Sequence, residues 1–155
     1  MLACERDAVK GHGVLRLAGF VNSLETGWAD GQVEPLVVAE TPGLVCVDAR
    51  NGFVQPVLDR FRDELVSRAR RAGICRLQIR NSHHFAALWP DLEPFATRGL
   101  VAFACVNSKK RMAGWSGGAA VLGTNAMAFG VPREGAMPVI WDQSSSVLSQ
   151  GDILH

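Results

Sequence analysis

The segments that join the later strand candidates constrain the fold of this chain more than any other feature. Apolar, β-prone runs at 100–106, 126–131 and 138–141 predict three strands. The segments between them are short or rich in glycine and serine. Parallel strands need a crossover of a dozen or more residues, usually a helix, whereas antiparallel strands can be joined by a turn. The sequence therefore predicts a mixed or largely antiparallel sheet.

The first part of the chain alternates between helical and strand patterns. Apolar residues recur at helical spacing in two segments, and Gly73, a residue typical of helix ends, follows the second. The predicted elements in chain order are a helix at 14–25, β-prone runs at 35–39 and 44–48, a helix at 57–72, a strand at 74–79 and a helix at 92–98. With the later strands they predict an α/β chain of the α+β type, in which helices surround the sheet.

Length and composition limit the classes of protein to consider. With 155 residues, of which 48% are hydrophobic and 20% charged, the chain can bury the core of about one domain. Its net charge of +1 supplies no field that attracts nucleic acid or an anionic membrane. Uncharged apolar runs such as 100–107 are far shorter than the ~20 residues that span a bilayer, and residues 5–7 are charged where a signal peptide is apolar. We therefore predict a cytoplasmic protein that binds neither nucleic acid nor membranes.

The four cysteines, at positions 4, 46, 75 and 105, show neither a CxxC motif nor the spacing of zinc ligands. Three of them stand inside apolar stretches. This pattern predicts reduced, mostly buried thiols and no metal site.

His12 is the first candidate for chemistry. It stands between two glycines, which allow a backbone to approach a ligand closely, and its imidazole can donate a proton near neutral pH. Arg16 follows four residues later, on the same face if the segment is helical, and its guanidinium could bind a carboxylate. The alternative is that both are ordinary surface residues.

The strand predicted at 74–79 leads into a segment with a pair of histidines, His83 and His84, and small residues follow at 86–87. A helix that starts there would leave amide donors free to bind a phosphate or a carboxylate. Adjacent histidines point apart and have no third ligand near them, which excludes a zinc site. The alternative is a turn in which one histidine caps the helix.

Two glycine-rich segments, 114–118 and 123–125, flank Leu122. Neither matches the GxGxxG fingerprint or a Walker loop, so the usual dinucleotide motif is absent. Turn statistics favour plain connections over a ligand-binding role for these segments. Residues 142–146 supply an acid and three serine hydroxyls after a strand, which could bind a ribose or phosphate or could cap a helix.

Taken in order along the chain, these motifs resemble those of the malate/L-lactate dehydrogenase-like family of NAD(P)-dependent oxidoreductases. The motifs are Lys10-Gly11-His12-Gly13 with Arg16, Asn-Ser-His-His-Phe-Ala-Ala-Leu-Trp-Pro at 81–90, Gly-Thr-Asn-Ala-Met-Ala-Phe at 123–129 and Asp-Gln-Ser-Ser-Ser at 142–146. The resemblance extends from about Asp7 to the last residue. The doubled histidine and the following Phe-Ala-Ala-Leu-Trp are similar to the Δ1-piperideine-2-carboxylate/Δ1-pyrroline-2-carboxylate reductase branch.

The resemblance implies a non-Rossmann NAD(P)-binding fold, with a largely antiparallel sheet surrounded by helices, that works as a homodimer. Residues 1–80 would form a helix and strand region with the substrate-side histidine and arginine, and residues 81–155 a partial NAD(P)-binding domain. Family members extend further at both ends, so the fold expected here is incomplete.

The resemblance also assigns roles to single residues. His12 matches the proton donor of the family, and Asp152 matches an acid that assists it. Arg16 and Thr124 match substrate ligands. The positions that match the NADP site are His84, Phe85, Ala86, Ala87, Leu88, Asp142, Gln143 and Ser144, and no metal is implied.

The implied function is NADPH-dependent reduction of cyclic α-imino acids to L-pipecolate or L-proline, with NADH as the other possible reductant. Hydride would reach the imine carbon while Arg16 holds the carboxylate and His12 acts as the acid. One alternative is a 2-hydroxy acid dehydrogenase that acts on malate, lactate or a relative. Another is an inactive fragment or non-catalytic remnant, which is favoured by Gly11 in place of the serine that the family has there, together with the C-terminal region by which family members are longer. This alternative predicts little NADPH-dependent turnover by the purified chain.

Overall fold

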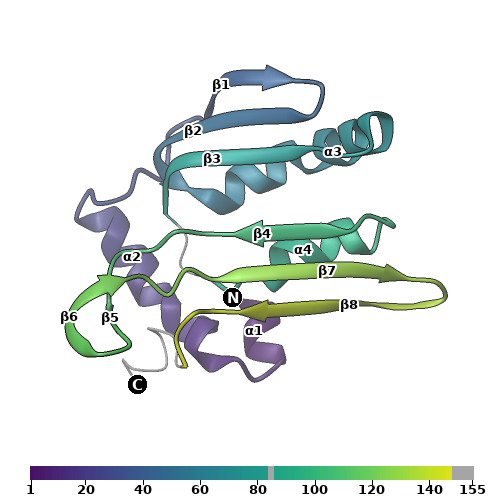
Figure 1. Cartoon of the computed structure of the whole chain (residues 1–155). Helices are drawn as coiled ribbons and strands as arrows, with labels where there is room; N and C mark the ends of the chain where they lie inside the picture. The colour runs from purple at the N-terminus through teal and green to yellow at the C-terminus, as the bar shows by residue number, and fades with distance from the viewer. Residues whose placement is uncertain (84–85, 148–155) are drawn as a thin grey trace. The chain divides into compact units, whose positions relative to one another are not determined.

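The computed structural model describes residues 1–83 and 86–147, and they belong to two compact units (Figure 1). One unit comprises residues 17–85, and the other combines residues 1–16 with 86–155. None of the helices in the described part of the chain is both long and apolar enough to cross a membrane.

The unit of residues 17–85 contains α2 (Leu17–Glu25) and a three-stranded sheet of β1 (Leu36–Thr41), β2 (Leu44–Phe53) and β3 (Arg76–His83), in the order β1-β2-β3. The pair β1–β2 is antiparallel and the pair β2–β3 is parallel. The crossover that parallel strands require is α3 (Val54–Ala72).

The core of this unit lies between β2 and α3. Alternate residues of β2 are buried, as the two-residue period of a strand requires, and α3 buries a stripe at helical spacing. Gly73 ends α3 in the left-handed conformation with a φ of 80°, which glycine adopts without steric cost. The buried side chains of this core include Val45, Val47, Val57, Phe61 and Leu65.

The other unit begins with α1 (Leu2–Arg6) and two single 3₁₀ turns, η1 (Lys10–His12) and η2 (Val14–Arg16). Its later part contains α4 (Trp89–Ala96), β4 (Ala102–Cys105), β5 (Met112–Gly114), β6 (Gly117–Leu122), β7 (Met127–Arg133) and β8 (Ala136–Gln143). The strands form an antiparallel sheet in the order β4-β7-β8 and a separate antiparallel hairpin, β5–β6.

The core of the second unit lies between α4 and one face of the β4-β7-β8 sheet. Leu88, Leu92 and Ala128 are buried there, and the small side chains of Ala102 and Ala104 pack against them. Small residues on this face allow the helix to approach the strands closely.

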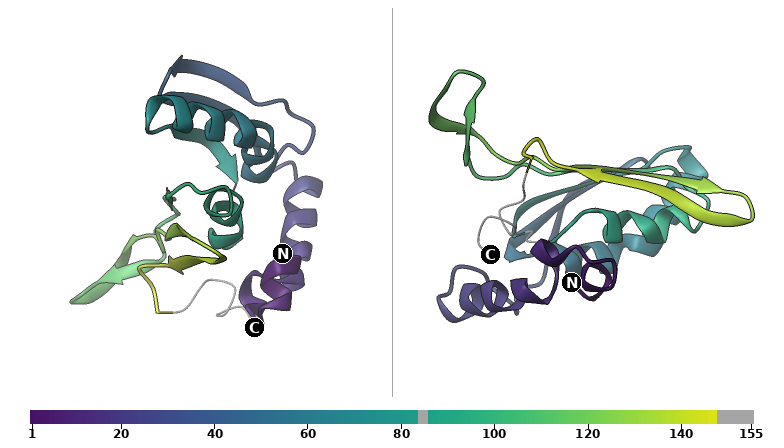
Figure 2. Two further views of the ribbon diagram at one scale, coloured as in Figure 1. Left: turned by 90° about the vertical axis from the view of Figure 1, so that its right-hand side faces the viewer. Right: turned by 90° about the horizontal axis from the view of Figure 1, so that it is seen from below.

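The opposite face of the same sheet carries an aromatic row. Strand register aligns Phe103 with Phe129 and Phe129 with Trp141, and their exposed fractions are 60%, 38% and 48%. Because successive side chains of a strand point to opposite faces, this row lies on the face away from Ala102, Ala104 and Ala128. The β5–β6 hairpin extends away from this sheet (Figure 2), and Trp115 at its turn is fully exposed.

The structure confirms the mixed sheet, with one parallel pair and otherwise antiparallel pairs in the described residues. The glycine-rich segment 114–118 connects β5 and β6 as the turn of a hairpin, which agrees with the plain connection that turn statistics favour. One prediction is wrong: the four cysteines, all described, are free thiols as expected, but Cys4 alone is buried and Cys105 is exposed.

The compact units divide the chain at residues 16 and 85, whereas the sequence suggested one division after residue 80. The cofactor role expected for 81–155 stays a prediction.

Candidate active site

Asp142 joins the end of β8 to the start of α4. Its Oδ2 accepts hydrogen bonds from the backbone N–H of Leu88 at 2.7 Å and from that of Trp89 at 2.9 Å. The first N–H groups of a helix have no partner within the helix, and the positive end of the helix dipole favours a carboxylate. The half-buried Asp142 therefore caps α4 from a position 54 residues later in the chain.

This contact bears on two alternatives that the sequence left open for Asp142, a helix cap and a ligand of a ribose or phosphate; the cap is observed, and the cofactor role stays a prediction. Asp142 binds backbone amides of the helix start, so its side chain acts as a helix cap. The expectation that the amides at this helix start are free to bind a phosphate is wrong for Leu88 and Trp89, because one carboxylate already accepts from both. Ala86 and Ala87, which precede them, are half-buried.

Cys4 connects α1 to the same segment. Its side chain is wholly buried. Burial raises the pKa of the thiol, a hydrogen bond with the backbone of Ala87 opposes the rise, and the charge of Asp142 adds to it. The N-terminal helix thus packs beside the segment that resembles a cofactor-binding stretch. No local pattern of the sequence indicated this contact.

His12 ends η1, and Arg16 ends η2. Between the two turns Gly13 is extended, with a ψ of −152°, so the segment is not one continuous helix. The argument that places both side chains on one helical face is therefore wrong, because the chain changes direction at Gly13. Both residues are half-buried.

Glu5 holds the break between these two turns. Its Oε2 accepts a hydrogen bond from the backbone N–H of Val14 at 2.9 Å. A Cβ at position 13 would collide with the same carboxylate oxygen. A side chain at position 13 would therefore displace the Glu5 carboxylate from this hydrogen bond, and Glu5 is a residue of this segment that sequence reasoning missed.

Thr124 lies in a small polar network. Its hydroxyl is 3.0 Å from the hydroxyl of Ser108, which also accepts from the backbone N–H of Asn125 at 3.2 Å. The carbonyl of Thr124 accepts from the N–H of Ser145 at 2.7 Å. The segment around Thr124 is therefore joined directly to the segment 142–146 that follows β8.

The remaining predicted residues divide into two groups. Gln143 is exposed, and the half-buried Ser144 bonds through its hydroxyl to Ser146. His84, Phe85 and Asp152 lie outside the described residues. The described residues to which the resemblance assigns a role, from His12 to Ser144, all belong to the unit of residues 1–16 and 86–155.

His83, at the end of β3, belongs to the other unit and has its own network. Its Nε2 lies 2.7 Å from Oδ1 of Asn51, whose Nδ2 donates to the carbonyl of Trp28 at 3.1 Å. Because the Asn51 amide nitrogen is the donor to that carbonyl, its oxygen accepts, and Nε2 of His83 carries the hydrogen. The imidazole also packs against the ring of Trp28, with ring centroids 4.2 Å apart and the two planes tilted by 51°.

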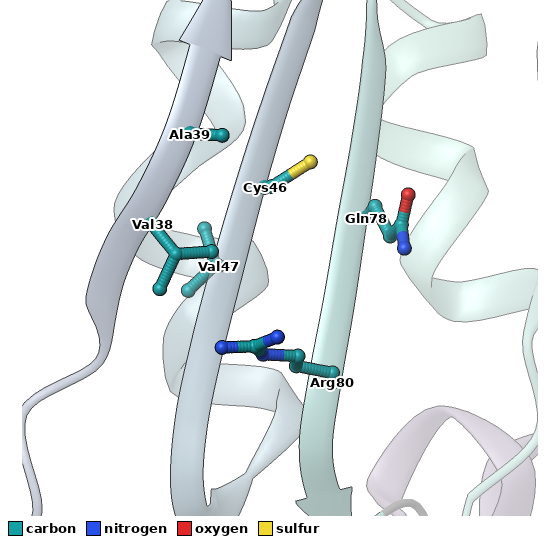
Figure 3. A pocket seen from close by; sticks show the side chains of 6 residues that line it. All are labelled: Val38, Ala39, Cys46, Val47, Gln78 and Arg80. Carbon is teal, nitrogen blue, oxygen red and sulfur yellow. The ribbon is translucent and has the colours of Figure 1, made fainter.

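A shallow hollow of about 390 Å³ lies on the β1-β2-β3 sheet (Figure 3). It is lined by Val38, Ala39, Cys46, Val47, Gln78 and Arg80. None of these residues was a sequence candidate. Within residues 1–83 and 86–147 no group of three or more potential ligands could hold a metal ion.

Comparison with known proteins identifies the family of this chain. The sequence profile described as malate/L-lactate dehydrogenase matches residues 1–155. The chain belongs to the malate/L-lactate dehydrogenase family.

Two curated family members carry the name Δ1-pyrroline-2-carboxylate/Δ1-piperideine-2-carboxylate reductase. The protein from Pseudomonas syringae pv. tomato is 45% identical over 151 residues, and that from Pseudomonas putida is 46% identical over 151 residues. Each match covers 97% of this chain and 44% of the relative. This chain thus spans less than half the length of the relatives it matches.

Solved structures of the family share the fold. The crystal structure of Δ1-piperideine-2-carboxylate reductase from Pseudomonas syringae aligns with a TM-score of 0.92 at 45% identity, over 97% of this chain and 46% of that one. Malate dehydrogenase from Entamoeba histolytica aligns with a TM-score of 0.89 at 24% identity, over 97% and 42%, and this likeness concerns the fold alone.

Proposed function

We propose that this family member acts in the NADPH-dependent reduction of cyclic α-imino acids, from Δ1-piperideine-2-carboxylate or Δ1-pyrroline-2-carboxylate to L-pipecolate or L-proline. The observation that carries the proposal is the junction at Asp142. It ties the segment at 86–89 to the end of β8 in a chain 45% identical to a relative that bears this reductase name.

The residues at this junction fit a nicotinamide dinucleotide. Ala86 and Ala87 are small and half-buried, so a flat ring or a ribose can approach the backbone closely. Gln143 and Ser144 place an amide and a hydroxyl directly after the capping carboxylate. In this proposal Asp142 shapes the site and leaves the polar contacts to its neighbours. The bound dinucleotide supplies the hydride that reduces the imine carbon.

Substrate binding falls to Arg16 and Thr124. The guanidinium of Arg16 can hold a carboxylate with two parallel hydrogen bonds, and the hydroxyl of Thr124 adds a third polar contact. His12 supplies or holds a proton at the ring nitrogen. The break at Gly13, which Glu5 maintains, sets the direction of the chain between His12 and Arg16. Asp152 is proposed to assist His12.

The test measures NADPH oxidation by the purified chain with Δ1-piperideine-2-carboxylate, beside pyruvate and oxaloacetate. We expect turnover with the imine that is lost in His12→Ala, and a raised KM with little change in kcat in Arg16→Ala, because Arg16 binds ground state and transition state alike. NADH in place of NADPH measures the cofactor preference.

Two results would contradict the proposal. Turnover with the 2-oxo acids but not with the imine identifies a 2-hydroxy acid dehydrogenase. Absence of turnover with every substrate, together with a melting temperature that NADPH does not raise, identifies a non-catalytic protein. We also propose a cytoplasmic homodimer, which light scattering of the purified chain tests by its mass.

A further inference from the structure

The Thr124 network contains a residue to which the sequence assigned no role. Ser108 lies in the segment between β4 and β5, 16 residues before Thr124. Its hydroxyl contacts the Thr124 hydroxyl at 3.0 Å, and its backbone N–H donates to Oδ1 of Asn125 at 3.1 Å. Ser108 thus contacts Thr124 through its hydroxyl and the next residue, Asn125, through its backbone.

The backbone on both sides of Thr124 lies close to the same serine. Gly123 is buried, and a Cβ at this position would collide with the carbonyl and hydroxyl oxygens of Ser108. Asn125 has a φ of +40°, an uncommon conformation for a residue with a side chain. Its amide and backbone bonds to Ser108 hold it there. The position of the Thr124 side chain is therefore set by contacts on each side.

The hydrogen bonds also favour one direction between the two hydroxyls. The N–H of Asn125 donates to Oγ of Ser108 at 3.2 Å, which occupies one of its two lone pairs. A hydroxyl oxygen that accepts a hydrogen bond becomes a better donor of its own hydrogen. In the favoured direction Ser108 would donate to Oγ1 of Thr124, which would leave the hydrogen of Thr124 for another acceptor.

We propose that Ser108 is a positioning residue, which donates its hydroxyl hydrogen to Thr124 so that Thr124 presents its own hydrogen to the substrate carboxylate. With the opposite direction Thr124 would present lone pairs to a negatively charged group, which repel it. The inference rests on the proposed function, because it takes the imino acid carboxylate as the acceptor.

The experiment measures binding of pyrrole-2-carboxylate, a planar five-membered ring with a nitrogen and an adjacent carboxylate. Isothermal titration of the purified chain compares Ser108→Ala, Thr124→Val and the double variant with the unchanged protein. We expect Thr124→Val to weaken binding about tenfold, since a hydrogen bond to a charged group is lost. Ser108→Ala should weaken it about fivefold, and the double variant should bind no more weakly than Thr124→Val.

Two further variants separate orientation from loss of structure. Ser108→Thr keeps the hydroxyl at an exposed position and should restore binding to within about twofold of the unchanged protein. Ser67→Ala is the matched control. It removes an exposed serine hydroxyl whose hydrogen-bond partner, Arg71, lies on the same helix, α3. In turnover with the imine, Ser108→Ala should raise KM and leave kcat nearly unchanged.

The outcomes distinguish this inference from the proposed function. Probe binding that Ser108→Ala leaves unchanged, or losses that add in the double variant, overturns the role of Ser108 while the reductase proposal stands. An unchanged protein that neither binds the probe nor turns over the imine overturns the proposed function and this inference with it.

Discussion

Removal of the Asp142 carboxylate should destabilise the protein in two distinguishable steps. Both N–H groups, of Leu88 and of Trp89, donate to the same oxygen, Oδ2. The single carbonyl oxygen of an asparagine has two lone pairs and can accept both bonds. Asp142→Asn therefore loses only the attraction between the charge and the helix start, about 1 kcal/mol. Asp142→Ala loses both bonds beside the buried Leu88, about 3 kcal/mol.

Urea unfolding followed by circular dichroism measures the two losses in the free energy of unfolding, and thermal unfolding measures the corresponding melting temperatures. At about 2–4 °C per kcal/mol for a chain of this size, the melting temperature should fall by about 3 °C in Asp142→Asn and about 9 °C in Asp142→Ala. Amide hydrogen exchange at Leu88 and Trp89 should accelerate in the alanine variant more than elsewhere in α4. Glu134→Ala, which removes an exposed carboxylate from the β7–β8 turn, is the control and should change little.

The reasoning is refuted if Asp142→Ala unfolds within about 0.5 kcal/mol of the unchanged protein. It is also refuted if Asp142→Asn is as damaging as Asp142→Ala, because the charge alone would then carry the contribution that we assign to the two hydrogen bonds.

Three further predictions concern other parts of the chain. Gly123→Ala should destabilise by about 2 kcal/mol in urea unfolding, because its Cβ meets the carbonyl of Ser108. Hydrogen bonds from Arg50 N–H and the Asn81 amide hold the pKa of Asp48 below its ordinary 3.8. The stability that these hydrogen bonds contribute is fully present above pH 3.8 and is lost as the pH falls through the lower pKa of the folded state. Asp48→Asn should therefore flatten the pH dependence of the free energy of unfolding in this acid range. At pH 7.5, iodoacetamide should modify the exposed Cys105 before the buried Cys4, as peptide mass spectrometry would show.

Elements with a strong local period could be predicted from the sequence. The apolar spacing at 57–72 indicates a helix that the structure extends to Val54–Ala72, and the strand predicted at 126–131 is β7. These elements carry their signal within one stretch of chain, because the side that faces the core repeats at the period of a helix or a strand.

Two features of the candidate site could not be predicted because their causes lie far apart in the sequence. The partner amides of Asp142 are more than 50 residues away, and no local pattern distinguishes a carboxylate that caps a distant helix from one that binds a ribose. Similarly, Ser108 carries no motif, and its role depends on the fold placing it beside Thr124. The β5–β6 hairpin was missed because glycine, at 117 and 118, is depleted in strands.

The unit that combines residues 1–16 with 86–155 is built from two separate stretches of chain, and this affects its folding during synthesis on the ribosome. Residues 17–85 form a compact unit from one uninterrupted stretch, so they can fold as soon as that stretch has emerged. The first sixteen residues cannot, because the surroundings of Cys4 include Ala87 and Asp142. At 5–20 residues per second, α1 leaves the ribosome on the order of ten seconds before Asp142 does. During that interval Cys4 is not yet buried, and we expect a nascent-chain chaperone to bind at Cys4 and Leu2.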